Sequence, residues 1–273
     1  LLASLLRALP TGCRLILVGD PDQLPPVGPG CPLSDILRSG VVPAVRLTEI
    51  FRQAQESLIV MNAHRVNSGV MPDLKTVTSD FFFLRRRTEE AVASTIGDLC
   101  RTRLPDRMGI PPEEIQVLSP TRKGPTGTAS LNLLLQAQLN PPAPDKKEKK
   151  WGDFSFREGD RVMQVKNNYD ILWEDHAGGV GMGIFNGDIG RIESIDPASG
   201  LVTVDFDGHR AAYPPDMMTQ LELAYAVTVH KAQGSEYRAV ILSAVEAAPM
   251  LLTRGILYTA MTRAKELLIL VGD

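Results

Sequence analysis

Residues 228–237 (TVHKAQGSEY) combine a hydroxyl, an imidazole, an ammonium, an amide, a glycine and a carboxylate between two apolar segments. A loop of this composition has several donors for phosphate oxygens and one acceptor for a sugar hydroxyl. Taken alone, this loop predicts phosphate-binding and sugar-binding chemistry at the end of a buried element.

A second polar loop follows residues 15–18, a short apolar run typical of a strand buried on both faces of a parallel sheet. In open α/β sheets, ligands bind beyond the carboxyl ends of strands. Asp20 and Gln23, in residues 19–27, are therefore placed where a nucleotide phosphate or an attacking water could bind. A tight turn built by proline and aspartate is the equally balanced alternative.

Two further strand ends carry cations. Residues 45–47 suggest a strand, and Arg52 follows it closely enough to reach a phosphate with its planar guanidinium. Residues 115–118 predict a strand that leads into Thr121, Arg122 and Lys123, a combination of hydroxyl and cations that suits a nucleic-acid backbone. An ordinary surface arginine and a solvated basic loop remain the alternatives.

The apolar pattern predicts the α/β elements that must position these loops. Apolar residues at helical spacing indicate helices at about residues 58–69, 92–100, 131–139 and 256–264, and short apolar runs indicate strands at 81–84, 115–118, 240–245 and 267–271. The hexapeptide LILVGD occurs at residues 15–20 and again at 268–273. This repeat is consistent with the ordinary composition of buried parallel strands, and also with two similar sheets that face each other across a ligand.

The composition changes after Asn140, where a proline-rich and then mostly basic stretch predicts a linker or exposed loop. Short alternating strands at 161–165 and 201–206, with Asn-Gly and Asp-Gly turns at 186–187 and 207–208, predict a small β-barrel inserted into the α/β domain. Asn168 lies among residues that could contact nucleic acid through amide donors and an aromatic ring, although a turn is the default interpretation.

The bulk properties exclude several classes of protein. A chain of 273 residues with 44% hydrophobic content can bury a substantial core in two or more domains, and a net charge of −3 argues against a globally basic nucleic-acid coat. Three cysteines with no metal-like spacing to the four histidines predict a reduced, cytoplasmic protein without a zinc site. No apolar run approaches the roughly 20 residues of a membrane span, and no signal peptide is evident. The chain lacks an initiator Met and begins within an apolar helical pattern, so we expect a fragment of a longer chain.

Four segments in order resemble the motifs of superfamily 1 helicases. Residues 19–27 are similar to motif III, 47–53 to motif IV, 228–237 to motif V and 258–265 to motif VI. The β insertion between motifs IV and V makes the chain similar to the RecD-like helicases of the exodeoxyribonuclease V alpha-subunit type. The resemblance implies an α/β fold, with a RecA-like parallel-sheet motor domain and an inserted SH3-like β-barrel. The implied division is 1–43 for the C-terminal part of a first RecA-like domain, 44–150 and 216–273 for the two segments of a second, and 151–215 for the barrel.

The resemblance also implies roles for individual residues. Gln23 would contact the γ-phosphate or its attacking water, and Arg52 and Arg263 would reach that phosphate from the second domain. Asp20, Gly234 and Glu236 would belong to the nucleotide site, with Glu236 accepting from the ribose. Thr228 and His230 would hold the DNA backbone. This assignment fits phosphoryl transfer, which depends on cationic charge over the phosphoryl oxygens and is accelerated when arginines are supplied from a facing domain.

The departures from the family pattern concern the phosphate cradle. The sequence contains no Gly-x-x-x-x-Gly-Lys-Ser/Thr loop and no Asp-Glu pair for Mg²⁺ at a strand end. We therefore expect ATP with Mg²⁺ to require motifs that precede Leu1, and we expect this fragment alone to be inactive as an ATPase.

Three functional hypotheses follow. The first is the C-terminal motor portion of an ATP-dependent 5′→3′ DNA helicase, which acts on single-stranded DNA and duplex ends, alone or with nuclease-complex subunits, and not at a membrane. The second is a truncated, non-catalytic module that binds single-stranded DNA or a partner helicase. The third is an ATP-dependent RNA translocase, because contacts to the phosphate backbone alone discriminate DNA from RNA poorly.

Overall fold

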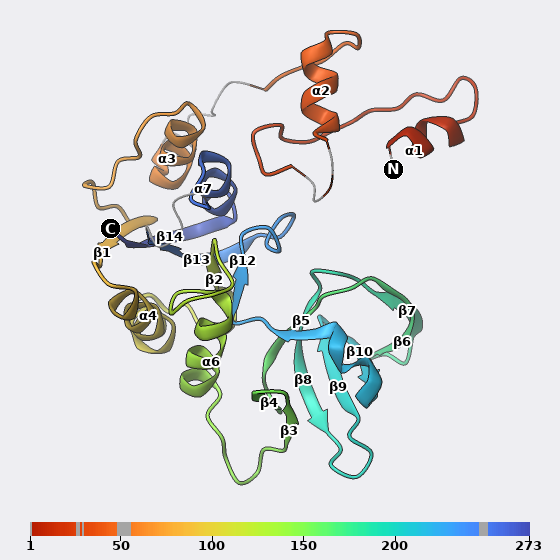
Figure 1. Ribbon diagram of the computed structural model, residues 1–273, viewed down its shortest axis with the longest axis vertical. Helices are drawn as coiled ribbons and strands as arrows, with labels where there is room; N and C mark the ends of the chain where they lie inside the picture. Colours follow the sequence, from red (N-terminus) through yellow and green to blue (C-terminus); the bar gives the residue numbers. More distant parts are fainter. Residues whose placement is uncertain (1, 26–27, 29, 48–55, 246–250) are drawn as a thin grey trace.

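A five-stranded parallel sheet forms the centre of the computed structural model, which describes residues 2–25, 28, 30–47, 56–245 and 251–273 (Figure 1). Its strand order is β1-β14-β13-β2-β12, and every neighbouring pair is parallel. The strands are β1 (Phe81–Arg85), β14 (Ala264–Gly272), β13 (Tyr237–Ala244), β2 (Ile115–Ser119) and β12 (Ala226–Thr228). The sequence predictions of strands at 81–84, 115–118, 240–245 and 267–271 are confirmed, with β13 and β14 each beginning three residues earlier than expected.

Helices cover both faces of this sheet (Figure 1). On β13, Val240 and Leu242 pack in the cluster that contains α3 (Leu58–Asn67) and α7 (Arg254–Met261). The alternate residues Ala239 and Ile241 pack with α4 (Glu89–Asp98) and α6 (Thr128–Leu139). Because neighbouring side chains of a strand point to opposite faces, a strand covered on both sides must be apolar at consecutive positions. This requirement explains the continuous apolar runs in the sequence.

Hydroxyl side chains cap three of these helices. Ser57, Thr88 and Thr253 precede α3, α4 and α7, and each side chain accepts a hydrogen bond from a backbone N–H of the first turn. Such a cap stabilises a helix by about 1 kcal/mol relative to alanine. The local sequence therefore sets where these helices begin. After α4, the chain continues through a π-helical turn (Leu99–Arg103), α5 (Leu104–Met108) and a 3₁₀ turn (Pro112–Glu114) into β2.

A seven-stranded antiparallel sheet forms the inserted β unit. Its order is β11-β5-β8-β9-β10-β6-β7. The strands are β5 (Arg161–Gln164), β6 (Asn168–Asp175), β7 (Val180–Ile184), β8 (Ile189–Ile195), β9 (Val202–Phe206), β10 (His209–Tyr213) and β11 (Leu221–Leu223). A hairpin of β3 (Glu148–Trp151) and β4 (Phe154–Arg157) precedes the sheet, and a 3₁₀ turn (Pro215–Gln220) lies before β11. The expected turn at 207–208 joins β9 to β10, with φ of +52° at Asp207 and +89° at Gly208.

A buried carboxylate joins the two units. Asp160 is fully buried and accepts hydrogen bonds from Gln136 and Asn140 at the end of α6 (2.6 and 2.7 Å) and from Tyr225 (2.9 Å). The backbone N–H of Arg157 donates to it as well, at 2.7 Å. Burial raises the pKa of Asp160, and the hydrogen bonds offset this effect only in part. Tyr225 lies between β11 in the antiparallel sheet and β12 in the parallel sheet, so this network holds the chain where it passes from one sheet to the other.

The predictions of two strands near the N-terminus are wrong. Residues 15–18 and 45–47 form no strand, and Val18 and Leu47 are 93% and 94% exposed. A parallel strand needs hydrogen-bonding neighbours and cover on both faces, and no described residues supply either to these segments. In Figure 1, α1 (Leu2–Ala8) and α2 (Pro32–Ser39) lie apart from the five-stranded sheet. The loop at residues 20–24, in contrast, contacts α7.

Candidate active site

Arg263 lies between α7 and β14 and is only 6% exposed. Two backbone carbonyls orient its guanidinium: Nη1 donates to the Ser235 oxygen at 2.9 Å, and Nε donates to the Thr259 oxygen at 3.2 Å. Ser235 belongs to the loop between β12 and β13, the loop with which the sequence analysis began. The arginine is therefore held between that loop and α7.

The remaining nitrogen of Arg263 faces neutral oxygens. Nη2 donates to Gln23 Oε1 at 3.3 Å and to Thr262 Oγ1 at 3.1 Å. Within the described residues, no carboxylate lies within 4.0 Å of the guanidinium. A buried cation without a counter-ion is costly unless hydrogen bonds and an anionic ligand compensate it. This site therefore suits a negatively charged group at Nη2.

Gln23 is positioned through Asp20. The Gln23 amide donates to Asp20 Oδ2 at 3.3 Å, and the Tyr258 hydroxyl donates to the same oxygen at 2.8 Å. Burial, followed by the hydrogen bond and charge of Asp20, raises the pKa of Tyr258 above its ordinary value of 10. Tyr258 consequently remains a donor at neutral pH. Asp20, predicted at the nucleotide site, serves here as the anchor of the turn that carries Gln23.

The backbone of Leu24 is held on both sides by distant residues. Its N–H donates to Thr259 Oγ1 of α7 at 3.0 Å, and its carbonyl accepts from the side chain of Gln233. Beside it, Asn67 of α3 donates to Asp22 Oδ2 at 3.0 Å. Residues more than 200 positions apart in the sequence are thus packed into one site, and the predicted residues Gln23 and Arg263 are brought into contact.

Gly234 and Glu236 lie in the loop between β12 and β13 but are not part of the hydrogen-bond network around Gln23 and Arg263. Gly234 has φ of +84°, a left-handed conformation that favours glycine. The Glu236 carboxylate is 57% exposed and lies 3.5 Å from Lys265 Nζ. Both positions are accessible to a ligand at the edge of the site. Arg52 lies outside the described residues.

The predicted nucleic-acid residues gather mainly at two adjacent loops. Thr228 of β12 pairs with Ser119 of β2, so the loops that follow these strands leave the sheet side by side. One loop carries Thr121, Arg122 and Lys123, and the other carries His230 and Lys231; the side chains of Arg122, Lys123 and His230 are exposed. Asn168 lies apart from them, at the start of β6, where its side chain donates to Gln220 at 3.0 Å and accepts from the backbone of Asp170 and Ile171.

Sequence reasoning missed three residues of these clusters. Tyr258 holds Asp20, Lys231 forms an ion pair with Glu222 at 2.9 Å, and Glu222 also binds Arg122 at 3.0 Å. Tyr258 and Lys231 fall inside segments that had been singled out, so their polar groups were available as a signal. Glu222 stands in an apolar segment, and nothing in its local pattern indicated a site.

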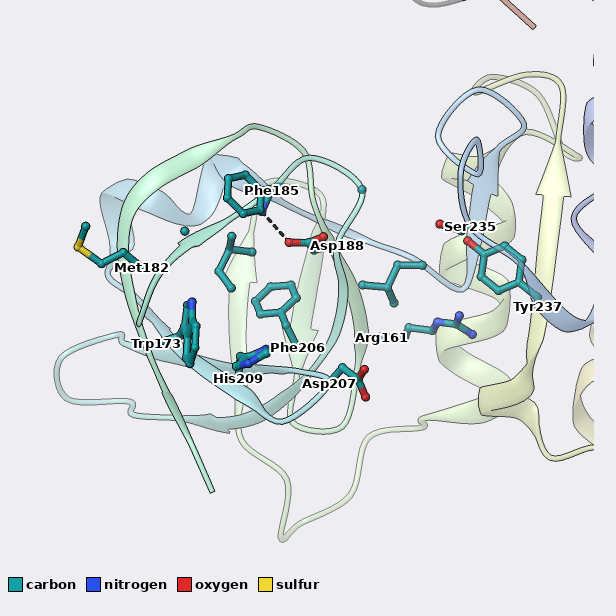
Figure 2. A pocket seen from close by; sticks show the side chains of 14 residues that line it. Arg161, Trp173, Met182, Phe185, Asp188, Phe206, Asp207, His209, Ser235 and Tyr237 are labelled. Carbon is teal, nitrogen blue, oxygen red and sulfur yellow. Dashed lines mark hydrogen bonds between the residues drawn. The ribbon is translucent and has the colours of Figure 1, made fainter. Parts of the chain in front are cut away.

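A separate cavity of about 590 Å³ lies against the β unit, and Figure 2 shows the residues that line it. Its wall includes Trp173, Phe185 and Phe206 from the antiparallel strands and their connections, and Ser235 and Tyr237 lie at its other end. Arg161 extends between these two ends. The cavity therefore reaches from the β unit to the loop that contacts Arg263.

No group of three or more His, Cys, Asp or Glu side chains in the described residues could hold a metal ion. No helix among them is both long and apolar enough to cross a membrane.

Comparisons with known proteins match this architecture. The model of the ATP-dependent RecD-like DNA helicase SH3 domain matches residues 131–206, and the model of the UvrD-like helicase C-terminal domain matches residues 223–271. An AAA domain model matches residues 1–80. The ATP-dependent RecD2 DNA helicase of Deinococcus radiodurans is 37% identical over 266 residues, or 97% of this chain. The chain is related to the RecD-like DNA helicases.

The chain is also similar to the RecBCD enzyme subunit RecD of Mycolicibacterium smegmatis, with 28% identity over 293 residues. It spans 33% of the Deinococcus relative and 47% of the mycobacterial one. Among solved structures, Bacteroides Pif1 bound to ssDNA aligns with a TM-score of 0.49 and 17% identity, covering 95% of this chain and 62% of the Pif1 chain.

The matched regions correspond to the parts of the site. The AAA region contains Gln23, the UvrD-like region contains residues 228–237 and Arg263, and the SH3 region contains most of the antiparallel strands. The predicted fold class, an α/β RecA-like sheet with an SH3-like β insertion, is confirmed. The predicted resemblance to RecD-like helicases is confirmed as well.

Proposed function

We propose that this RecD-like chain is the C-terminal motor portion of an ATP-dependent DNA helicase. It would couple ATP hydrolysis to 5′→3′ translocation on single-stranded DNA and to duplex unwinding. The proposed division is 1–43 for part of a first RecA-like domain, 44–150 and 216–273 for a second, and 151–215 for the barrel, whose sheet β11 of the last segment joins. Its nucleic-acid partners would be single-stranded DNA and duplex ends, and the RecD relatives suggest nuclease-complex subunits as further partners.

The contact between Arg263 Nη2 and Gln23 Oε1, at 3.3 Å, carries this proposal. It joins the AAA region to the UvrD-like region through a buried cation that has no carboxylate partner among the described residues. A γ-phosphate at this point would replace neutral oxygens with anionic ones at Nη2, while Nη1 and Nε remain held by backbone carbonyls. An arginine placed in this way stabilises the charge of the phosphoryl-transfer transition state.

The other nucleotide contacts are proposed around this pair. Arg52 would supply a second cation, Glu236 would accept from the ribose, and Gly234 would let the nucleotide approach the backbone. Asp20 would act through Gln23, which it holds. The cofactor would be ATP with Mg²⁺. Since the sequence contains no P-loop, the phosphates and Mg²⁺ would be held by residues outside it.

The loops after β2 and β12 would hold the DNA backbone. Thr121, Arg122 and Lys123 would contact phosphates from one loop, and Thr228 and His230 from the other. Their adjacency at the carboxyl ends of β2 and β12 supports this role, because hydroxyls and cations fix phosphates without reading bases. Asn168, in the β unit, would contact the same strand if its hydrogen bond to Gln220 opens.

The test is Arg263→Ala, with Arg263→Lys as the conservative variant, in the complete protein. Removal of an arginine of this type lowers phosphoryl-transfer rates by about 10³–10⁵ in GTPases, so we expect loss of DNA-stimulated ATPase activity in both variants. Arg254→Ala, an exposed arginine at the start of α7, is the matched control and should retain activity. If folded Arg263→Ala protein hydrolyses ATP near the wild-type rate, the proposed role is wrong.

Titration of this chain with a fluorescent single-stranded oligonucleotide distinguishes the motor from a non-catalytic binding module. Negligible binding is expected if the chain forms only part of a motor groove. Tight binding that ATP does not change would instead support the module. A comparison of DNA and RNA as activators of the complete protein's ATPase separates a DNA helicase from an RNA translocase.

A further inference from the structure

We infer that Glu222 occupies the position of a nucleic-acid phosphate between Arg122 and Lys231, and that a phosphate must displace it to bind. The inference rests on the proposed function. It assigns a phosphodiester site to Arg122 and Lys231, two cations that lie in different segments of the sequence. Glu222 would be the competing anion of that site.

Three separate elements build the site. Arg122 follows β2, Glu222 lies in β11, and Lys231 follows β12. One carboxylate oxygen of Glu222 lies 3.0 Å from Arg122 Nη2, and the other lies 2.9 Å from Lys231 Nζ. Glu222 thus bridges the two cations with separate oxygens, as a phosphate with two non-bridging oxygens can.

The surroundings suit a backbone phosphate. The backbone N–H of Lys231 donates to Thr228 Oγ1 at 3.4 Å, which places the proposed DNA-binding hydroxyl in the same turn as the lysine. Thr228 and both cations also line one small pocket with Glu222. A strand held by Thr228 would therefore run next to the bridged pair.

The bridge can exchange because it is only partly buried. The side chain of Glu222 is 41% exposed and that of Arg122 is 63% exposed. Ion pairs with this exposure are weak and are screened by salt, so an incoming phosphate can compete for the cations. Two cations and one carboxylate also leave a net positive charge, which attracts the phosphate before the exchange.

Competition of this kind has a functional consequence. While no phosphate is bound, Glu222 keeps Arg122 and Lys231 together and oriented. When the strand advances, the carboxylate can return and release the phosphate. The site would therefore bind each phosphate less tightly than two uncompensated cations would, as stepping along a strand requires.

The experiment measures binding of a fluorescent 20-nucleotide oligo(dT) to the complete protein by anisotropy between 50 and 300 mM NaCl. We expect Glu222→Gln to bind about three- to tenfold more tightly at low salt, because the phosphate no longer competes with a carboxylate. We also expect a steeper dependence of affinity on salt, since the two cations then release counter-ions on binding. Glu114→Gln is the matched control, because that glutamate pairs with Arg238 at 2.6 Å, outside this cluster.

A second variant tests the mechanism. In a Glu222→Gln, Lys231→Gln double variant the gain should be smaller, because one of the two cations that Glu222 bridges is absent. Unchanged or weaker binding by folded Glu222→Gln protein, with wild-type binding intact, overturns the inference and leaves the proposed function standing. If the complete wild-type protein does not bind oligo(dT), the proposed function fails and the inference fails with it.

Discussion

Replacement of Tyr258 by Phe tests how the site positions Gln23. The substitution removes only the hydroxyl that donates to Asp20 Oδ2 at 2.8 Å, the oxygen that also accepts from the Gln23 amide. A hydrogen bond to a charged group contributes about 1.5–3 kcal/mol. Asp20 retains two other donors, the Gln23 amide and the backbone N–H of Asp22 at 2.9 Å. We therefore expect the loss of the Tyr258 hydrogen bond to cost at most about 1.5 kcal/mol.

This limit predicts a moderate loss of rate. A change of 1.36 kcal/mol corresponds to a factor of ten, so kcat of the DNA-stimulated ATPase should fall about three- to tenfold in the complete protein. KM for ATP should change little, because Tyr258 would act on the orientation of Gln23 rather than on nucleotide binding. Tyr213→Phe is the matched control. It removes a buried hydroxyl that donates to Gln164 at 2.9 Å in the antiparallel sheet, and should lower stability without changing kcat.

A double-mutant cycle with Gln23→Ala decides whether Tyr258 acts through Gln23. If it does, Tyr258→Phe should have almost no further effect once Gln23 is absent. Effects on kcat that multiply in the double variant would refute the reasoning, because they would mean that Tyr258 influences the rate by another route.

Two further predictions concern stability. A Cβ atom on Gly127 would lie 2.4 Å from the Lys123 carbonyl oxygen, so Gly127→Ala should displace the loop, destabilise the protein by roughly 1–3 kcal/mol in urea unfolding, and weaken oligonucleotide binding; full stability would contradict the packing described. Burial alone raises the pKa of Asp80, but hydrogen bonds led by those from Thr78 and Ser57 outweigh it and hold the pKa below the ordinary 3.8. Asp80 should therefore stabilise the protein above about pH 4 and lose that contribution as pH falls through its folded pKa. Asp80→Asn should remove this acid dependence of the urea midpoint, and an unchanged pH profile would contradict the assignment.

Much of the candidate site could be predicted from the order and composition of its loops. Gln23 and Arg263 were predicted as site residues from their motifs, because each motif is a local stretch of sequence. Their contact could not be predicted from those motifs, because it depends on how a loop and a helix far apart in the sequence pack together. Glu222 was missed for a related reason. A single carboxylate in an apolar strand meets Arg122 and Lys231 only when β11 lies beside the loops after β2 and β12.

The positions of helices, turns and strands also differ in how far the local sequence predicts them. The helix starts at α3, α4 and α7 follow from hydroxyl caps and apolar spacing, both of which are local properties. The turn at 207–208 follows from the low cost of positive φ at Asp-Gly. The passage of the chain from β11 in one sheet to β12 in the other could not be predicted, because residues 221–228 form one nearly continuous apolar segment.

The repeated hexapeptide LILVGD separates the two levels most clearly. At residues 268–273 its first four side chains are almost fully buried in β14, between β1 and β13, with helices over both faces. At residues 15–18 the same four amino acids form no strand, and the side chains of Ile16 and Val18 are 74% and 93% exposed. The sequence by itself determined that both copies are apolar and suited to a buried strand. Only the tertiary structure decided which copy becomes one, because a parallel strand exists only where neighbours satisfy its backbone hydrogen bonds and helices cover its faces.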